Sequence, residues 1–275
     1  MLPPQPVVPS APWLWREGAP LAARPRPLPE ETAVALTYGR ATYAVMMATP
    51  DDLEDFAVGF SLNEGIVTAA DEIAALEVLA RPLGIELRMD LPPARETALI
   101  ARRRHVLGAT GCGLCGMESL EAATAPPPKV TAALAVPALA LAQAMAAMAS
   151  AQRLNRETHA VHAACFWDPA SGAMVLREDV GRHNALDKLA GALARAGTPP
   201  ASGVLLLTSR VSVELVQKAA VMGVGVVAAV SVPTALAVRV AETAGITLIA
   251  VARADGFEIF AHPERITARV TEHVA

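Results

Sequence analysis

The sequence predicts an α/β protein whose main part is a three-layer α/β/α sandwich. In the second half of the 275-residue chain, short apolar runs alternate with helical patterns at a spacing of roughly 20 residues. Such alternation is typical of right-handed βαβ units around a parallel sheet. Hydrophobic residues make up 53% of the chain but aromatic residues only 4%, so Ala and Val fill most of the core. Small side chains suit closely packed layers, and the length allows one large domain or two small ones.

Three parts are predicted along the chain. Residues 1–29 contain nine prolines, which exclude a helix or a central strand, and we expect an irregular arm there. Residues 30–125 are expected to form a smaller N-terminal α+β subdomain, and residues 129–275 the α/β core. The prolines at 126–128 make a plausible linker between the two.

The N-terminal subdomain is predicted to begin with a hairpin of strands 33–37 and 41–48, with a turn at 38–40. Thr49 then has the position of a helix N-cap and Pro50 that of the first helical residue. The apolar stripe of this helix is formed by Leu53, Phe56, Ala57 and Phe60. Gly65 is expected to end the helix, and residues 85–90 to form a further strand.

The core is predicted to begin with an Ala-rich helix within residues 131–153, packed against one face of the sheet. A hairpin of strands 161–167 and 173–178 follows, around a turn at 168–172. Strands and helices then alternate. Helices are expected at 184–196, 213–222 and 234–244, and strands at 204–207, 226–230 and 246–252.

Composition excludes several classes of function. The net charge of −4 and the low lysine content argue against a nucleic-acid surface. Three cysteines are too few for a disulfide framework, and their odd number indicates a reducing compartment. The N-terminus lacks the pattern of a signal peptide, and the apolar runs at 136–149 and 221–230 are too short or too weakly apolar to span a bilayer. We therefore expect a cytoplasmic protein without nucleic-acid or membrane partners.

The most informative segment is Thr-Gly-Cys-Gly-Leu-Cys-Gly at residues 110–116, which contains Cys112 and Cys115. Its glycines remove side chains that would block a partner, and they permit positive φ. A helical pattern begins just after the pair, and amide dipoles at a helix start lower the pKa of a thiol. Spacing alone leaves three interpretations open: a metal clip, a redox or structural disulfide, and a nucleophilic thiolate.

A second candidate site lies in residues 177–184, where six of eight side chains are polar or charged directly after a predicted strand. Arg182 and His183 could bind an anionic group with the help of amide groups at the following helix start. The alternative is an elaborate helix cap with a surface ion pair.

The ends of the next three strands also carry polar side chains, at 208–210, 231–234 and 251–256. Parallel sheets bind ligands outside these strand ends, and hydroxyl groups with arginines suggest a phosphate-bearing ligand. Helix capping is a sufficient reason for Ser231 and Thr234 at these positions, but it accounts less well for Arg210 and Arg253. The candidate ligand-binding residues here are Arg210, Val251, Ala252, Arg253, Ala254, Asp255 and Gly256.

No metal site is expected. His162 lies in an apolar strand pattern, where a histidine is usually a satisfied core residue, and Cys165 is expected to be a buried apolar thiol. The two side chains point to opposite faces of one strand, so a zinc ion shared with Cys112 and Cys115 is disfavoured.

Together these motifs resemble those of one family, the formate dehydrogenase accessory sulfurtransferases, also called FdhD. The resemblance covers nearly the whole chain after the proline-rich arm. It rests on residues 44–56 followed by Gly-Phe-Ser-Leu at 59–62, Cys-Gly-Leu-Cys-Gly at 112–116, Glu-Asp-Val-Gly-Arg-His-Asn-Ala-Leu-Asp-Lys at 178–188, Ser-Arg at 209–210, Val-Gln-Lys at 216–218 and His-Pro-Glu-Arg at 262–265.

The resemblance implies a core like that of the cytidine deaminases. Zinc deaminases use an H-x-E and a P-C-x-x-C motif. Here two alanines follow His162, and Gly111 precedes Cys112, so the glutamate that acts as general acid is missing. What the resemblance implies instead is sulfur transfer, in which a cysteine desulfurase loads a persulfide on the loop. The sulfur then passes to molybdenum in the bis(molybdopterin guanine dinucleotide) cofactor, as formate dehydrogenase activity requires.

By this resemblance Cys112 is the persulfide carrier, Cys115 a relay or protector, and 251–256 the segment that contacts the guanine dinucleotide. The chain would have no intrinsic cofactor and would bind the molybdenum cofactor, or a guanine nucleotide, as the group it sulfurates. The implied partners are the desulfurase and the formate dehydrogenase apoenzyme, and a second copy of the chain is a possible partner. Two alternatives stay open, a non-catalytic chaperone for the molybdenum cofactor and a zinc-dependent deaminase.

Overall fold

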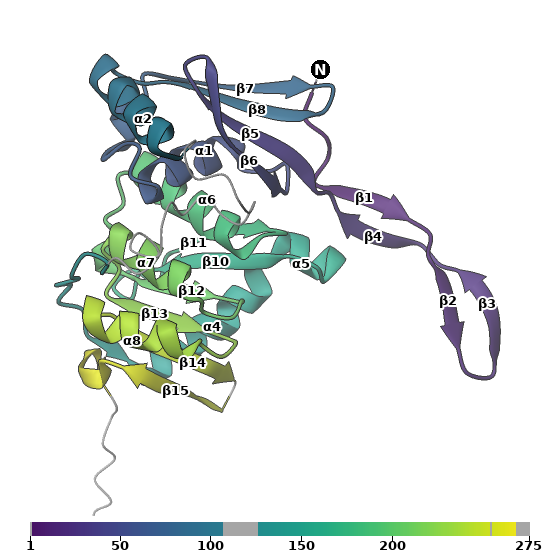
Figure 1. Ribbon diagram of the computed structural model, residues 1–275. Helices are drawn as coiled ribbons and strands as arrows, with labels where there is room; N and C mark the ends of the chain where they lie inside the picture. Colours follow the sequence, from purple (N-terminus) through teal and green to yellow (C-terminus); the bar gives the residue numbers. More distant parts are fainter. Residues whose placement is uncertain (1, 107–125, 254, 268–275) are drawn as a thin grey trace, which may run out of the picture.

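The computed structural model describes residues 2–106, 126–253 and 255–267. Figure 1 shows a ribbon arm, an N-terminal sheet with helices α1 and α2, and a larger α/β core. The division at residues 125–129 stays a prediction, since the chain just before it lies outside the described residues. No helix in the described ranges is both long and apolar enough to cross a membrane.

The core contains a six-stranded sheet in the order β11-β10-β12-β13-β14-β15. Strands β12, β13 and β14 are parallel, whereas the remaining pairs are antiparallel. The predicted hairpin and βαβαβ unit are therefore confirmed. The strands are β10 (His162–Trp167), β11 (Met174–Asp179), β12 (Val204–Leu207), β13 (Val226–Ala229), β14 (Thr247–Arg253) and β15 (Gly256–Ala261).

Helices cover both faces of this sheet. Alternate strand residues such as Phe166 and Leu205 pack with α6 (Arg182–Arg195), α7 (Val213–Met222) and α8 (Ala235–Ala244). The residues between them, such as Cys165 and Leu206, pack on the other face with α4 (Ala138–Ala151). Because strand side chains alternate between the two faces, both faces are apolar and the strands are continuous hydrophobic runs. The three-layer α/β/α architecture is confirmed.

The N-terminal sheet has the order β6-β5-β8-β7 and packs on α1 through Leu36, Phe56 and Phe60. The predicted hairpin, the strand near residue 85 and the apolar stripe of α1 are confirmed, whereas β7 and α2 were not predicted. The elements are β5 (Thr32–Tyr38), β6 (Ala41–Ala48), α1 (Leu53–Asn63), β7 (Ala75–Arg81), β8 (Gly84–Asp90) and α2 (Pro93–Val106). Shorter elements are η1 (Ala70–Glu72), η2 (Pro200–Ser202), η3 (Pro263–Arg265) and the parallel pair β9 (Val136–Pro137) and β16 (Ile266–Thr267).

The expectation of an irregular arm is wrong. Residues 7–29 form two successive antiparallel ribbons, in which β1 pairs with β4 and β2 with β3. A two-stranded ribbon has only edge strands, so a proline that lacks an N–H can face outward without breaking a ladder. The strands are β1 (Val7–Ser10), β2 (Trp13–Arg16), β3 (Ala19–Ala23) and β4 (Arg26–Pro29).

Three helix starts also differ from expectation. Helix α1 begins at Leu53 with Asp52 in the N-cap position, so the assignment of Thr49 as N-cap is wrong. Tertiary contacts to the backbone of Thr49 override its local preference, as described below. The Ala-rich helix begins only after the β9 pairing, and helix α6 starts at Arg182, two residues before the predicted start. The following short helix α5 (Arg153–Thr158) was not predicted as separate.

Helices α1 and α6 approach so closely that their backbones touch at two glycines. A Cβ atom on Gly59 would lie 1.7 Å from the carbonyl oxygen of Asp187, and one on Gly191 would lie 1.9 Å from that of Asp55. These obstacles are backbone atoms, so a larger residue can be accommodated only if the helices separate.

We therefore expect Gly191→Ala to lower the free energy of unfolding by about 1–3 kcal/mol or more. The matched control is Gly256→Ala, because a Cβ at Gly256 meets no atom within 4 Å. Denaturant unfolding of both variants checks the prediction. Equal stability of the two variants would contradict the close helix crossing.

Candidate functional site

The two predicted catalytic residues, Cys112 and Cys115, lie outside the described residues, as does Ala254. The described candidate residues gather at one edge of the core sheet, the edge at which parallel strands β12, β13 and β14 end. Helices α7 and α8 begin at this edge because each follows one of these strands. Helix α6 begins directly after β11, and Ala163 at the start of β10 donates its backbone N–H to Thr208 Oγ1 at 2.8 Å.

Five polar side chains form a group at this edge that we call the strand-end cluster: His162, Arg182, His183, Ser212 and Glu214. Ser212 Oγ donates to Glu214 Oε2 at 2.7 Å. The His183 Nε2 atom lies 3.5 Å from Ser212 Oγ and 3.4 Å from Glu214 Oε2. These contacts join the first turns of α6 and α7. Sequence analysis missed Ser212 and Glu214, since a serine before a helix and a glutamate in its first turn look like ordinary capping residues.

The positive charge of the cluster belongs to Arg182. Its Nε atom is buried and has no hydrogen-bond partner among the described residues. Burial lowers the pKa of both His162 and His183, and the nearby guanidinium of Arg182 lowers it further. The lowered pKa favours the neutral form of both imidazoles. A buried, unpaired guanidinium N–H is costly, and an anionic ligand would satisfy it.

The remaining candidates lie farther along the same edge. Arg253 Nη1 donates to the carbonyl oxygens of Val230 at 2.5 Å and Ala252 at 2.8 Å, so this side chain also ties β14 to the end of β13. Val251 has a φ of 53° and lies within a bulge of the β14–β15 pairing. Bulges next to a site re-aim side chains. Arg210 is exposed at the end of β12, between the two groups.

The structure thus divides the predicted ligand residues into two groups on one edge. Strand β11, which leads into Arg182 and His183, is four strand positions from β14. At the usual spacing this corresponds to about 19 Å. Only an extended ligand with more than one anionic group could contact both Arg182 and the segment around Arg253.

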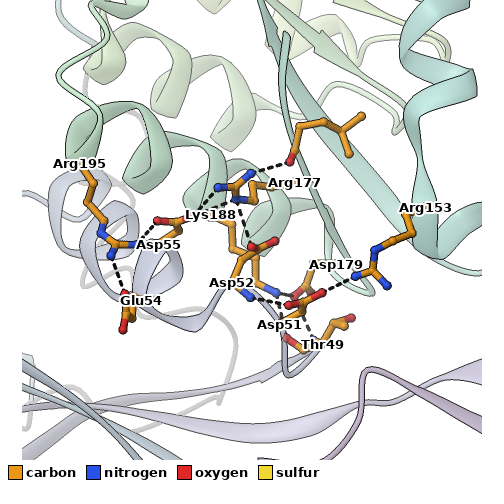
Figure 2. A network of polar contacts seen from close by, with 11 residues as sticks. Thr49, Asp51, Asp52, Glu54, Asp55, Arg153, Arg177, Asp179, Lys188 and Arg195 are labelled. Carbon is orange, nitrogen blue, oxygen red and sulfur yellow. Dashed lines mark hydrogen bonds and ion pairs between the residues drawn. The ribbon is translucent and has the colours of Figure 1, made fainter.

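Most of the charged motif at residues 178–188 has a structural role, and Figure 2 shows two of its members, Asp179 and Lys188, in contact with the segment before α1. Asp179 and Lys188 are fully buried and lie 2.7 Å apart. The backbone N–H of Thr49 donates to Asp179 Oδ2 at 3.0 Å, while Lys188 Nζ donates to the carbonyl oxygen of Thr49 at 2.9 Å. The Thr49 hydroxyl accepts from the backbone of Val180. This buried pair therefore fixes the segment before α1 on the core.

Further contacts, from the motif and from Arg177 and Arg195 on either side of it, also join α1, α5 and α7 to the core. Asp55 on α1 accepts hydrogen bonds from Arg177 at 2.7 Å and from Arg195 at 2.5 Å. Asp187 pairs with Lys218 on α7, and both oxygens of Glu178 accept backbone N–H groups at the start of α5. Within the motif, Arg182 and His183 are the residues that face the strand-end cluster.

His162 and Cys165 lie as predicted on opposite faces of β10. Cys165 is fully buried, and burial raises the pKa of its thiol to about 12, so it is a poor nucleophile. Over the ranges that the structure describes, no three His, Cys, Asp or Glu side chains are grouped so as to hold a metal ion. Cys112 and Cys115 lie outside these ranges.

A hollow of about 950 Å³ lies over the N-terminal sheet, away from the strand-end edge. Its charged lining is mainly acidic, with four carboxylates and two arginines. One of these arginines, Arg88, contacts Glu86 at 3.2 Å and Glu77 at 3.6 Å. The Arg182 Nε atom in the strand-end cluster has no hydrogen-bond partner among the described residues. The cluster is therefore the better candidate for binding an anionic ligand.

Comparison with known proteins gives consistent matches over most of the chain. The family model described as FdhD/NarQ family matches residues 29–267. The sulfur carrier protein FdhD of Agrobacterium fabrum is 52% identical over 252 residues, which cover 91% of this chain and 93% of that protein. The sulfur carrier protein FdhD of Cupriavidus necator is 47% identical, with coverage of 92% and 87%.

A crystal structure shares the fold. It is that of a protein from Desulfotalea psychrophila provisionally described as a formate dehydrogenase accessory protein. The TM-score is 0.73 and the sequence identity 24%, and the alignment covers 95% of this chain and 99% of that one.

Proposed function

The chain belongs to the FdhD/NarQ family, and on this premise we propose that it is a sulfur carrier in formate dehydrogenase maturation. It acts as a sulfurtransferase that accepts persulfide sulfur from a cysteine desulfurase and passes it to the molybdenum of the bis(molybdopterin guanine dinucleotide) cofactor. The observation that carries the proposal is the Cys-Gly-Leu-Cys-Gly sequence at 112–116 in a chain similar to sulfur carriers over most of its length. The scarcity of cysteines fits a reducing cytoplasm.

The chemistry needs a thiolate at Cys112. That thiolate attacks the outer sulfur of the desulfurase persulfide, and a new S–S bond forms as the desulfurase cysteine leaves as a thiolate. Cys112 then holds the outer sulfur as its own persulfide. If Cys115 is a relay, its thiolate takes this sulfur in the same manner and releases the thiolate of Cys112. Neither step requires an external oxidant.

The strand-end edge supplies the binding side of this function. Arg182, with its unpartnered Nε, and the first turns of α6 and α7 suit phosphate groups of the cofactor. A second group around Arg253 suits a second anionic part of an extended ligand. The same edge would serve the alternative function, a chaperone that binds the cofactor but transfers no sulfur. Deamination is disfavoured because His162 is followed by two alanines, so no glutamate stands two residues after this histidine, and because Gly111 rather than proline precedes Cys112.

The test is intact-mass analysis after incubation with a cysteine desulfurase and free cysteine. We expect the mass of one added sulfur atom, removable by a reducing thiol, and peptide mapping should locate it at Cys112. Cys165 is an internal control, since its buried thiol should stay unmodified. A chain that binds guanosine diphosphate but never gains sulfur would support the chaperone instead.

Binding at the strand-end edge can be measured with guanosine diphosphate as a probe for one half of the cofactor. We expect Arg182→Ala to weaken binding about 10- to 100-fold, which corresponds to ~1.5–3 kcal/mol for a hydrogen bond to a charged group. Arg253→Ala is the parallel test of the 251–256 segment. Arg239→Ala on the exposed side of α8 is the matched control. Unchanged affinity in calorimetry of both test variants would contradict a nucleotide site at this edge.

A further inference from the structure

The His-Pro-Glu-Arg motif at residues 262–265 lies at the edge of the core opposite the strand-end cluster, beside Thr247 at the start of β14. It directly follows β15, the edge strand of the core sheet (Figure 1). The pairing of β15 with β14 contains two register shifts. An edge strand has a neighbour on one side only, so contacts from outside the sheet matter for holding its end in place. The motif supplies such contacts.

The two ring nitrogens of His262 both face hydrogen-bond acceptors. Nδ1 lies 2.9 Å from Glu264 Oε1 in η3, and Nε2 lies 2.9 Å from the backbone carbonyl oxygen of Glu242 in the last turn of α8. A neutral imidazole has a single N–H and can donate to only one of these acceptors, whereas the imidazolium donates to both. The geometry therefore favours the protonated ring. We call His262 and its two acceptors the C-terminal clasp.

The surroundings of the ring favour a positive charge as well. Helix α8 contributes the carbonyl of Glu242 at its C-terminal end, where the helix dipole attracts cations. The charged groups that act on the ring, Glu264 and Arg265, both belong to η3, and β14 contributes the uncharged Thr247. The hydrogen bonds to the Glu242 carbonyl and to Glu264 raise the pKa of His262 above its ordinary value of 6.5. Partial burial and the charge of Arg265 oppose this change in pKa without cancelling it.

The backbone of His262 and the side chain of Arg265 connect the clasp to two further segments. The Thr247 hydroxyl donates to the carbonyl oxygen of His262 at 2.5 Å. Arg265 Nε donates to the carbonyl oxygen of Ala132 at 3.0 Å, and its Nη1 donates to Thr247 Oγ1 at 3.2 Å. The residues that follow form β16, which pairs with β9. The ends of β15 and α8, the start of β14 and the segment before β9 therefore meet at this motif.

We propose that the C-terminal clasp is a proton-dependent contact, in which protonated His262 joins η3 to the end of α8 and so holds the end of β15 on the core. Loss of the proton removes one of the two ring hydrogen bonds, so η3 and β16 then open more readily. This device is independent of the sulfur-transfer function.

The direction of the pH dependence follows from the two titrating partners. Because the pKa of His262 is raised in the folded chain, its contribution to stability is complete below the ordinary value of 6.5 and is lost as the pH rises through the raised value. Its own backbone N–H and His262 lower the pKa of Glu264, so the contribution of Glu264 is present above the ordinary value of 4.5 and is lost as the pH falls through the lowered value. The clasp is therefore strongest between about pH 4.5 and pH 6.5.

NMR titration of the histidine rings in the full chain is the first test. The His262 resonance is assigned by its absence from the spectrum of His262→Gln. We expect this ring to titrate with a pKa above 6.5, and to titrate at a lower pH in Glu264→Gln, which keeps an acceptor oxygen but removes the negative charge. A pKa at or below 6.5 in the unmodified chain would overturn the proposal.

Amide hydrogen exchange measures the opening itself. After correction for the intrinsic effect of pH on exchange, protection of the η3 and β16 amides should fall about two- to fivefold as the pH rises through the measured pKa, as expected for a partly exposed ion pair. His262→Gln should lack this step. The matched control is His159→Gln, which should keep the step, because His159 is also a histidine with positive φ but lies at the end of α5.

Amides of the central strands β12 and β13 should show no such step, which distinguishes local opening from a general loss of stability. Protection of η3 and β16 that stays constant through the titration would overturn the proposal. A step of equal size in the unmodified chain and in His262→Gln would also overturn it, because the titrating group would then be another residue.

Discussion

Replacing Cys112 by serine is expected to abolish the activation of formate dehydrogenase while the fold stays intact. A serine hydroxyl forms no thiolate at physiological pH and cannot hold a persulfide, so the transferred sulfur has no carrier. Co-expression of the variant with a formate dehydrogenase, followed by an activity assay, measures the effect. We expect activity no higher than in cells that lack the carrier.

The other cysteines provide the controls. Cys115→Ser should reduce activation less completely if Cys115 is a relay, and Cys165→Ala should leave activation unchanged because Cys165 is buried on the α4 face of the sheet. Guanosine diphosphate binding by the Cys112 variant should equal that of the unmodified chain. Full activation by Cys112→Ser, with binding retained, would refute sulfur transfer and favour the chaperone.

The core could be predicted because its local patterns agree with its tertiary structure. Strands β12 and β13 are buried on both faces, so they appear in the sequence as short continuous runs of Val, Leu and Ala. Glycines end the helices that follow them, at Gly223 and Gly245, both in the left-handed conformation. Thr234 caps α8 as predicted. Where local sequence signals and tertiary packing favour the same structure, a single sequence is sufficient to predict the helices and strands.

The segment before α1 shows why other features could not be predicted. Thr49 and Pro50 have the local pattern of a helix start, yet Asp179 and Lys188 bind the backbone of Thr49 from residues 130 or more positions away. The sequence does not reveal this long-range competition. The prediction of an irregular arm was wrong for a related reason. A high proline content excludes a central strand, but it does not exclude a ribbon made only of edge strands.

The candidate site was predicted in part. The charged residues at 178–188 stand out in the sequence as a candidate site. Charged residues are usually exposed, however, so the sequence gives no reason to expect a fully buried pair among them. Burial separates the structural members, such as Asp179 and Asp187, from Arg182 and His183 at the strand-end cluster. Ser212 and Glu214 join the cluster only because the sheet brings the starts of α6 and α7 together.

Lys188→Met is expected to lower the free energy of unfolding by about 3–5 kcal/mol, the usual cost of removing one partner from a buried ion pair. Methionine fills a similar volume, so the loss reflects charge more than packing. The carboxylate of Asp179 would keep hydrogen bonds from Thr49, Gly181 and Asn184 but lose its only cationic partner among the described residues. Denaturant unfolding measures the change.

The matched control is Arg153→Met, because Arg153 also pairs with the segment before α1, through Asp51 at 2.6 Å. That pair is solvent-exposed, so its loss should cost less than about 1 kcal/mol. Each variant removes one cation that pairs with or beside the segment before α1. The two cations differ mainly in how deeply their side chains are buried. Asp179→Asn combined with Lys188→Met should recover part of the stability, since no uncompensated charge then remains in the core. Equal losses for Lys188→Met and Arg153→Met would mean that the buried pair in Figure 2 stabilises this segment no more than an exposed ion pair does.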